Sequence, residues 1–235
     1  MRPALSIIVP SRNESDNLKR LIPELVQTLS VLGDACEVIV VDNGSTDATQ
    51  ETLQELTSRY PSVRSVYEGE KGFGRALLCG LREGQGEVLG YIHADNQMSP
   101  GEILRIYRTL RSDRLDVCKA VRLNRNDGVI RLIVSKTYNA LFRLLFGATV
   151  RDVNGSPKLF TKKFFDAAAL SSLDWFIDPE IVIKAARLGA RIGDVPIRTF
   201  RRESGVSKVR FGTVVEFIQN MTAQWLARRS HGKKK

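Results

Sequence analysis

The stretch that decides the fold of this chain is VLGYIHADNQ, residues 88–97. Its apolar first half, residues 88–92, has the character of a buried strand. A carboxylate, Asp95, and an amide, Gln97, follow it two residues apart. Because residues i and i+2 of an extended chain lie on the same side, we expect Asp95 and Gln97 to point together. Two hard oxygen donors at the carboxyl end of a strand suit a divalent cation that keeps positions free for phosphate oxygens.

A plainer interpretation of the same stretch is the start of a helix. In that case Asn96 or Ser99 would cap a helix that begins near Pro100. This interpretation is the favoured one for the stretch taken alone, because polar residues commonly precede helices. The organisation of the rest of the chain decides against it.

Short apolar runs alternate along the chain with segments of helical periodicity. The expected strands are residues 5–9, 37–41, 63–67, 88–92 and 116–121, and the expected helices are residues 16–32, 47–59, 73–83 and 100–110. Such alternation predicts an α/β fold with a mainly parallel sheet that helices cover on both faces.

The second half of the chain is less regular. It shows, in order, an apolar helix (131–146), a short strand (158–160), a helix (179–188), a strand (191–196), a basic loop (201–208) and an amphipathic helix (211–229). Since no clear linker or internal repeat interrupts the pattern, we expect one domain, residues 1–210. An amphipathic helix and basic tail, residues 211–235, would follow it.

The composition limits the class of protein. With 235 residues, of which 43% are hydrophobic, the chain can form a full core. Its three cysteines are widely spaced, which argues against a disulfide framework or a zinc site and fits a reducing cytoplasm. No signal-peptide pattern and no apolar stretch of roughly 20 residues is found, so we expect a soluble or peripheral protein.

The net charge of +10 is concentrated in the C-terminal segment. From Arg198 to Lys235 there are ten Lys or Arg residues against two acidic ones, whereas the rest of the chain is nearly balanced. A nucleic-acid-binding protein would more often spread its basic groups over the folded domain. We therefore expect no nucleic-acid partner.

Polar residues also follow the first expected strand. Arg12 and Glu14 lie in the loop that leads to the first helix. An ordinary helix cap explains Ser15 or Asp16 in this loop, but it does not explain Glu14 at the end of the sheet where ligands bind. Glu14 is therefore a candidate binding residue.

The second expected strand ends in Asp42, which suits acceptance of hydrogen bonds from a base or ribose. Gly44 permits a tight turn after it, and Ser45 or Thr46 is expected to cap the next helix. Residues 72–75 (GFGR) open a later helix but fit neither GxGxxG nor the Walker A pattern. We expect them to form a closely packed helix start under the nucleotide instead of a phosphate cradle.

In their order and spacing these motifs resemble glycosyltransferase family 2, in its dolichol- or polyprenyl-phosphate mannosyltransferase-like branch. The resemblance covers roughly residues 5–210, and no single motif is specific. The motifs are IVP (8–10), NE (13–14), NL (17–18), VVDNGSTD (40–47), KGFG (71–74), ADNQ (94–97), Pro100, DV (116–117), Arg122, DVNGS (152–156), Glu180, Gly189, VP (195–196) and RESGVSK (202–208). The resemblance implies the GT-A fold of nucleotide-diphospho-sugar transferases, which is a Rossmann-like mixed and mainly parallel sheet flanked by helices. A C-terminal amphipathic helix would follow the sheet.

The resemblance also implies roles for single residues. A nucleotide-sugar donor would be bound by Pro10, Arg12, Glu14, Asp42, Ala94, Asp95 and Arg122. Asp95 and Gln97 would hold Mg²⁺ or Mn²⁺ on the diphosphate. Phosphates of the donor or of a polyprenyl phosphate acceptor would contact Arg122, Lys158, Arg202, Ser207 and Lys208.

Catalysis would depend on Asp95 and, where the acceptor needs a general base, on Asp178 or Glu180. An acceptor that is already a phosphate anion needs no strong base, whereas an alcohol does. The alternative for Asp178 and Glu180 is that they complement the dipole at the start of a helix, and the two interpretations have equal weight.

The chain departs from the family pattern at two positions. The family often has Asp where His93 stands, which would give DxD, so one metal ligand or water contact is missing here. A neutral His93 could still bind metal or phosphate, but we favour a hydrogen-bonding role for it. Lys158 stands where the family often has Arg, which keeps the charge but loses the bidentate fork.

The C-terminal segment fits two arrangements equally well. Its apolar stripe, its Trp225 and its terminal lysines suit an anionic membrane surface. Alternatively, residues 211–226 pack onto the domain or join two copies as a homodimer. Most residues of the apolar helix 131–146 are expected to pack in the core, although this helix could also line a groove for a prenyl chain.

These observations together predict an inverting, metal-dependent transferase. It would move a hexosyl group from GDP-mannose or a UDP-hexose to polyprenyl phosphate at the cytoplasmic membrane face. One alternative is a family 2 transferase that acts on a glycan or another hydroxyl acceptor. Another is a non-catalytic module that binds nucleotide sugars or lipid.

Overall fold

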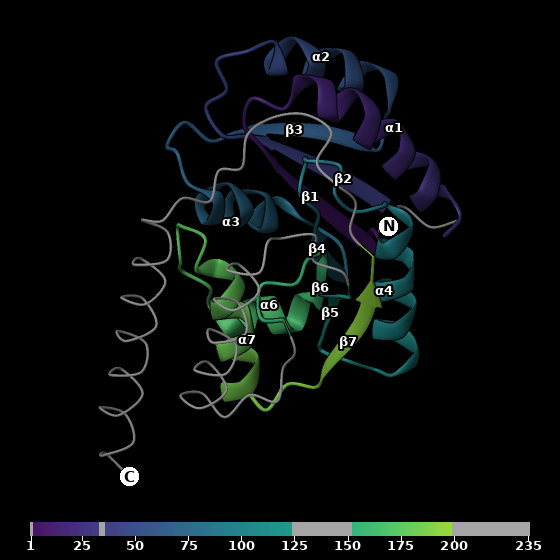
Figure 1. Ribbon diagram of the computed structural model, residues 1–235, viewed down its shortest axis with the longest axis vertical. Coiled ribbons are helices and arrows are strands. Elements are labelled where there is room, and N and C mark those ends of the chain that lie inside the picture. Colours follow the sequence, from purple (N-terminus) through teal and green to yellow (C-terminus); the bar gives the residue numbers. More distant parts are fainter. Residues whose placement is uncertain (1, 33–35, 124–151, 199–235) are drawn as a thin grey trace.

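The computed structural model describes residues 2–32, 36–123 and 152–198. They form a seven-stranded sheet in the order β3-β2-β1-β4-β6-β5-β7, with helices on both faces (Figure 1). The strands are β1 (Leu5–Ser11), β2 (Cys36–Asp42), β3 (Val63–Tyr67), β4 (Val88–Tyr91), β5 (Val117–Arg122), β6 (Lys158–Thr161) and β7 (Ile192–Ile197). The helices are α1 (Ser15–Ser30), α2 (Thr49–Arg59), α3 (Phe73–Glu83), α4 (Gly101–Ser112), α6 (Lys162–Ala168) and α7 (Ile177–Arg187).

One strand of the sheet is reversed. β6 runs antiparallel to its neighbours β4 and β5, whereas the other neighbouring pairs are parallel. The predicted mainly parallel α/β sheet is therefore confirmed. Because parallel strands end at the same edge, the carboxyl ends of β1, β2, β4 and β5 meet there. The reversal of β6 brings its first residue, Lys158, to that edge opposite Tyr91.

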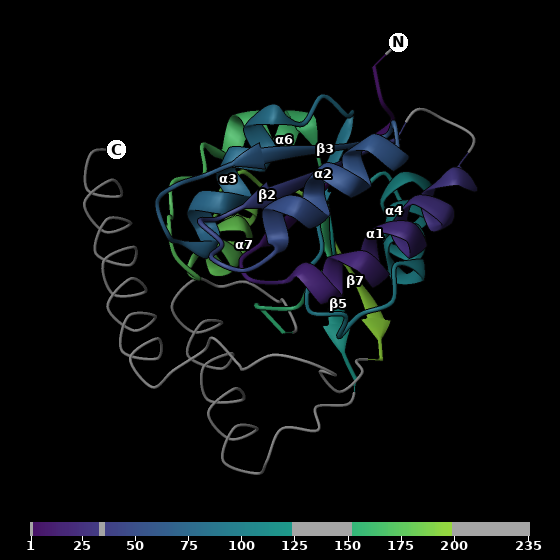
Figure 2. The same ribbon diagram turned by 90° about the horizontal axis from the view of Figure 1, so that it is seen from above.

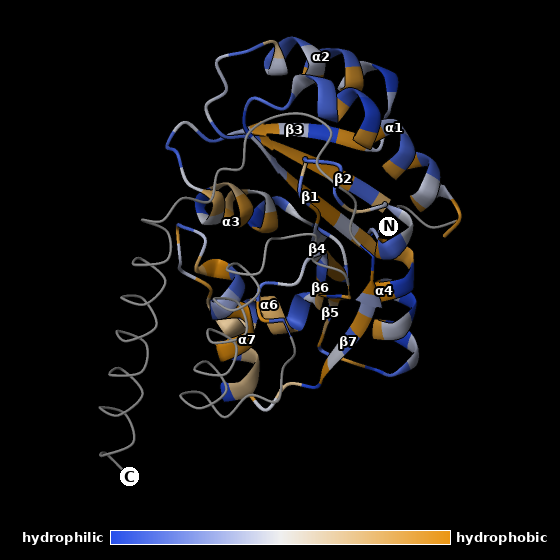
Figure 3. Cartoon of the chain, in the orientation of Figure 1, coloured by the Kyte–Doolittle hydropathy of each residue, from blue (hydrophilic) through white to orange (hydrophobic). Residues whose placement is uncertain are grey.

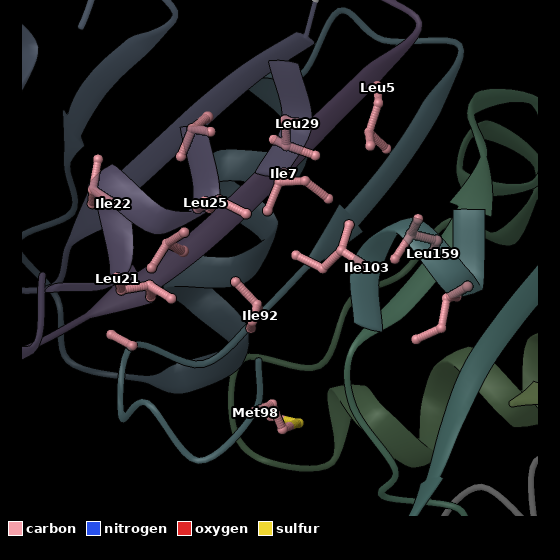
Figure 4. Close-up of a cluster of buried hydrophobic side chains, with 14 of the residues drawn as sticks. Leu5, Ile7, Leu21, Ile22, Leu25, Leu29, Ile92, Met98, Ile103 and Leu159 are labelled. Carbon is pink, nitrogen blue, oxygen red and sulfur yellow. The ribbon is translucent and has the colours of Figure 1, made fainter. Parts of the chain in front are cut away.

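Two apolar clusters hold the layers of the fold together. Helices α1, α2 and α4 cover one face of the sheet, and α3, α6 and α7 cover the other (Figures 1 and 2). Ile7 and Val9 of β1 pack in the first cluster and Ile8 in the second, as the alternation of side chains along a strand requires. In the first cluster, side chains of α1 and α4 meet those of β1 (Figure 4).

The central strands are apolar along most of their length. Every residue of β1 except Pro10 is buried, and the hydrophobic colour runs along β1 and β2 in Figure 3. Continuous apolar strands are typical of a sheet that is covered on both faces. For this reason apolar runs, and not strict polar–apolar alternation, located the strands in the sequence.

Each strand and helix expected within the described residues is present, with ends within two residues of those predicted. The sequence missed α6, whose seven residues are too few to show a helical period; Thr161 caps it by accepting a hydrogen bond from Phe164 N at 3.1 Å. The expected elements at residues 131–146, 201–208 and 211–229 lie outside the described residues. None of the described helices is both long and apolar enough to cross a bilayer.

Helix α3 lies very close to the sheet at Gly80. A Cβ atom added there would stand 2.6 Å from Cγ2 of Ile8 and 2.8 Å from Cγ2 of Val41. Both neighbours are β-branched and therefore stiff, so they do not move away at low cost. The close approach of helix and strand thus requires a residue without a side chain.

We expect Gly80→Ala to destabilise the fold, because overpacking costs about 1–3 kcal/mol while the gain in helix propensity is at most about 1 kcal/mol. Gly101→Ala is a matched control, since the nearest atom to its added Cβ is Ser99 Oγ at 3.5 Å. Urea denaturation of both variants measures the difference. A Gly80→Ala protein as stable as the unmodified chain would contradict the close packing.

Candidate active site

The residues singled out in the sequence gather at the carboxyl edge of the sheet. They follow or end four parallel strands, and one begins the reversed strand: Arg12 and Glu14 (after β1), Asp42 (β2), Ala94, Asp95 and Gln97 (after β4), Arg122 (β5) and Lys158 (β6). Pro10 and Arg12 are half-buried, and Ala94 is buried. Arg202, Ser207 and Lys208 lie outside the described residues, so their phosphate contacts stay predictions.

Side-chain hydrogen bonds join the loops after β1 and β2. Asn13, which has a left-handed backbone (φ 54°), donates from its backbone N to Ser45 Oγ at 2.9 Å and accepts from Thr46 N at 2.8 Å. The expectation that Ser45 or Thr46 caps α2 is therefore wrong. The N-cap residue of α2 is Ala48, which makes no side-chain cap bond, and Asp47 Oδ1 accepts a hydrogen bond from Thr49 N at 3.1 Å. The two loops form one polar unit.

Asp42 is held in this unit and is nearly fully buried. Its Oδ1 accepts a hydrogen bond from Ser45 N at 3.0 Å, and its Oδ2 accepts one from Gln50 Nε2 at 3.2 Å. Gly44 makes the tight turn that was expected, with φ 65°. A carboxylate has about four acceptor positions, so both oxygens of Asp42 keep capacity for a ligand. Its role toward the donor remains a prediction.

Asn43 is a residue whose importance the sequence did not reveal. Its Nδ2 donates to Glu70 O at 2.7 Å and to Glu68 O at 3.1 Å, and its Oδ1 accepts from Gly72 N at 2.8 Å. One side chain thus fixes the loop between β3 and α3. The signal available in the sequence was an Asn directly after the last residue of an expected strand.

A second chain of hydrogen bonds links the loop after β1 to the loop after β4. Asn17 Nδ2 donates to Glu14 Oε2 at 2.5 Å, and Asn96 Nδ2 donates to Asn17 O and Oδ1 at 3.2 and 3.3 Å. Ser15 or Asp16 was considered as the cap of α1, but neither side chain makes that bond; Ser15 Oγ bonds Thr52 Oγ1. Glu14 is therefore coupled to the loop that carries Asp95.

Asp95 and Gln97 do not lie on an extended strand, as was expected, but in a turn after β4. Strand β4 ends at Tyr91 and Asn96 is left-handed (φ 54°), so the i, i+2 rule of a strand does not apply. Instead, a turn brings the two residues together, and Gln97 N donates to Asp95 Oδ1 at 3.2 Å. The alternative is right that a helix begins next to Pro100, but the N-cap residue of α4 is Pro100 itself and not Asn96 or Ser99. Ser99 Oγ accepts a hydrogen bond from Gly101 N at 3.3 Å.

The donor set of this turn fits a divalent cation that is also bound by substrate. Asp95 and Gln97 are half-buried, and they supply one carboxylate and one amide oxygen. In the part of the chain that the structure describes, no three His, Cys, Asp or Glu residues are placed to hold a metal. Mg²⁺ commonly binds one or two carboxylates and completes its shell with waters and phosphate oxygens. A cation here would need the diphosphate.

His93 lies where the predicted site residues converge. Burial lowers the pKa of His93; Lys158 and Arg122 act in the same direction, and Asp95 and Asp178 oppose them. The imidazole is therefore neutral near pH 7. The structure thus brings the ends of β4, β5, β6 and the start of α7 around one ring.

Lys158 and Asp178 pair with each other in the interior. Lys158 Nζ contacts Asp178 Oδ1 and lies 3.1 Å from Tyr91 Oη, and the Tyr91 hydroxyl donates to the same carboxylate oxygen. Lys158 is fully buried and Asp178 is 4% exposed. Burial lowers the pKa of Lys158, which Asp178 opposes, and burial raises the pKa of Tyr91. Lys158 therefore sits in a buried ion pair, and its phosphate role remains a prediction.

Two further charged side chains order the neighbouring strand. Lys119, opposite Lys158 in the β5–β6 register, is fully buried with Nζ 3.0 Å from Asp194 Oδ1 and 3.0 Å from Asp152 O. Arg122 forms a two-pronged pair with Asp152 through Nε and an Nη atom, both at 2.8 Å. Lys119 was missed, although a Lys inside the apolar run VCKAV was a visible signal. The phosphate role of Arg122 remains a prediction.

Glu180 anchors a loop. It is fully buried, and its carboxylate accepts hydrogen bonds from the backbone N of Ser171 (3.1 Å) and Ser172 (2.8 Å) and from Ser171 Oγ (3.1 Å). It also lies in the first turn of α7, as the dipole interpretation expected. This geometry favours a structural role for Glu180 over that of a general base.

The start of α3 packs against the same loop. Arg75 N donates to Leu173 O at 3.0 Å, and a Cβ atom on Gly74 would stand 2.3 Å from Ser172 O. The expectation of a tightly packed helix start is right, but the partner observed is the 172–174 backbone. Residues 72–75 therefore place the loop that precedes α7.

The ion pair of Lys158 and Asp178 makes a testable demand on stability. We expect Lys158→Met to cost about 3–5 kcal/mol, because it leaves a buried carboxylate without its cation. Adding Asp178→Leu should recover part of the loss. The exposed pair of Lys162 and Asp166 is the control, and Lys162→Met should cost about 0.3–0.5 kcal/mol. Urea denaturation at pH 7 measures all three, and similar losses at both lysines would contradict the pairing.

Comparisons with known proteins show which family the chain is similar to. The profile of Glycosyl transferase family 2 matches residues 6–170. An undecaprenyl-phosphate mannosyltransferase from Micrococcus luteus is 30% identical over an alignment of 242 residues, gaps included. The alignment covers 96% of this chain and 95% of that protein. A dolichol-phosphate mannosyltransferase from Pyrococcus furiosus is 28% identical over 225 residues. That match covers 92% of this chain but 62% of the Pyrococcus protein, so this chain spans less than two thirds of that relative.

Solved structures show the same fold. Glucosyl-3-phosphoglycerate synthase from Mycobacterium tuberculosis, crystallised with phosphoglyceric acid, superposes with a TM-score of 0.72 at 19% identity, over 96% of this chain and 80% of that one. The same enzyme in complex with Mn²⁺, UDP and glucosyl-3-phosphoglycerate gives a TM-score of 0.67 at 19% identity, over 96% and 78%. The GT-A arrangement expected from the sequence is thus confirmed, and the chain belongs to glycosyl transferase family 2.

Proposed function

We propose that this chain is an inverting, metal-dependent glycosyltransferase that moves a hexosyl group from a nucleoside-diphosphate sugar to polyprenyl phosphate. Family membership and relatives named for undecaprenyl-phosphate and dolichol-phosphate mannosyl transfer support this proposal. The donor would be GDP-mannose or a UDP-hexose. The observation that carries the choice of acceptor is the state of the two carboxylates considered as general bases.

Asp178 and Glu180 are both committed to contacts within the protein. Asp178 accepts hydrogen bonds from Lys158 and Tyr91, and Glu180 accepts them from two backbone N–H groups and a hydroxyl. A hydroxyl acceptor must lose its proton to a base during transfer, whereas a phosphate monoester arrives as an anion. The engagement of both carboxylates therefore favours an acceptor that is already ionised.

The donor side of the reaction would use the carboxyl edge of the sheet. Asp42 and Glu14 offer acceptor oxygens for base and ribose hydroxyls, and Arg122, oriented by Asp152, offers positive charge. As the sugar–diphosphate bond breaks, negative charge builds on the leaving group, and fixed cations stabilise it. A Mg²⁺ or Mn²⁺ ion bound by Asp95 and Gln97 would add Lewis-acid stabilisation of the diphosphate.

A panel of labelled nucleotide sugars tests the proposal. Incubation with Mn²⁺ and polyprenyl phosphate should give organic-extractable label with one donor. Label in a soluble glycan would instead support a hydroxyl acceptor, and donor binding without turnover would support a non-catalytic module. We expect Asp95→Ala to lower transfer by about 10²–10³-fold, whereas Asp113→Ala, an exposed control, should leave it unchanged. Near-normal transfer by the Asp95 variant would refute the metal role.

The acceptor would bring the protein to the cytoplasmic face of a membrane, where we propose a peripheral contact through residues 211–235. These residues combine an apolar stripe with a basic end. Deletion from Phe211 onward should weaken cosedimentation with vesicles that contain anionic lipid. Vesicles of neutral lipid are the control, and unchanged cosedimentation of the shortened protein would favour packing onto the domain or a homodimer.

A further inference from the structure

Three rings form a compact stack beside the proposed metal turn. We define this ring stack as Phe73, His93 and Trp175. Phe73 and Trp175 lie 4.2 Å apart between ring centroids at an interplanar angle of 8°, and Phe73 and His93 lie 5.1 Å apart at 18°. His93 and Trp175 are 6.1 Å apart at 25°. The two separations that involve His93 lie within the range of favourable aromatic pairs, about 4.5–7 Å, and Phe73 and Trp175 lie closer together than that.

The ring stack joins three separate parts of the chain. Phe73 is the first residue of α3, His93 follows β4, and Trp175 belongs to the loop before α7. That loop is already held at its other end, where Glu180 accepts the N–H groups of Ser171 and Ser172. The stack therefore holds this loop on the side of the metal turn, together with the hydrogen bond from Arg75 N to Leu173 O.

His93 has contacts that suit a packing ring. Its ring faces Phe73 and Trp175, and Tyr91 meets it edge-on at 6.1 Å and 84°. Although Asp95 and Asp178 are close enough to act on its charge, the described residues hold no trio of His, Cys, Asp or Glu arranged for a metal. A ligating imidazole aims a ring nitrogen at the ion, usually with its other nitrogen hydrogen-bonded. The contacts found here are to ring faces and edges instead.

We propose that His93 is a positioning residue that acts through the ring stack and not a metal ligand. Where the family often has a charged Asp, this chain has an aromatic ring. That ring contacts Phe73 and Trp175 and so holds Trp175 and the 171–175 loop against the site. This inference rests on the proposed function only where Mn²⁺ binding and sugar transfer are measured. The aromatic geometry itself is tested independently.

The first test uses the full chain in a Trp225→Phe background, which leaves Trp175 as the single tryptophan of the two. Acrylamide quenching of Trp175 emission should be the same with His93 and with His93→Phe, and stronger with His93→Ala. Equal quenching in His93→Ala would overturn the stack. If the Ala variant does not fold, His93→Leu supplies the same comparison, because it fills volume without an aromatic face.

The second test separates positioning from ligation. Binding of Mn²⁺, followed by electron paramagnetic resonance with UDP or GDP present, should stay within about twofold in His93→Phe, while loss of a coordinated group would weaken it by about tenfold or more. For transfer, we expect kcat/KM to fall about three- to tenfold in His93→Ala and to recover in His93→Phe. Weaker Mn²⁺ binding in the Phe variant would overturn the proposal. If the unmodified chain bound no Mn²⁺, the proposed function would fail while the quenching result still decided the stack.

Discussion

The buried contact between Lys158 and Asp178 sets the relation between the two halves of this domain. It joins β6 to α7, and the hydroxyl of Tyr91 adds β4 to the same group. An isolated charge at either position would carry a large desolvation cost, so the folded state requires both partners together. Because Lys158 begins β6, this requirement brings a reversed strand and the start of a helix to the edge where the parallel strands end.

Polar side chains fix the loops of the site. Asn13 and Asn43 each bridge two loops, and Asn96 joins its loop to the first turn of α1. Asn13 and Asn96 have left-handed backbones, which asparagine tolerates well. Glu180 holds the loop before α7 by its backbone N–H groups. These hydrogen bonds join the loops to one another without any ligand, so they give this edge of the sheet a defined shape.

Several carboxylates at this edge of the sheet are engaged in contacts within the protein. Asp178, Glu180 and Asp152 serve cations or N–H groups of the protein, while Asp95 and Gln97 share a turn that is half-buried. This division of the acidic groups favours an acceptor that brings its own charge. His93, a neutral ring, stands two residues before Asp95, where the family often has a second carboxylate.

The sequence by itself determined the α/β architecture, since long apolar runs and helical periods are local properties of the chain. It also located Asp42 at the end of a strand and Asp95 shortly after one, because both positions follow from where the apolar runs stop, whereas Arg122 came from the family resemblance. Only the tertiary structure decided which charges meet. Lys158 and Asp178 are 20 residues apart, Lys119 and Asp194 much further, and burial turns each into an ion pair. Such pairing depends on the order and direction of the strands. No local pattern of the sequence predicts that β6 runs antiparallel to its neighbours.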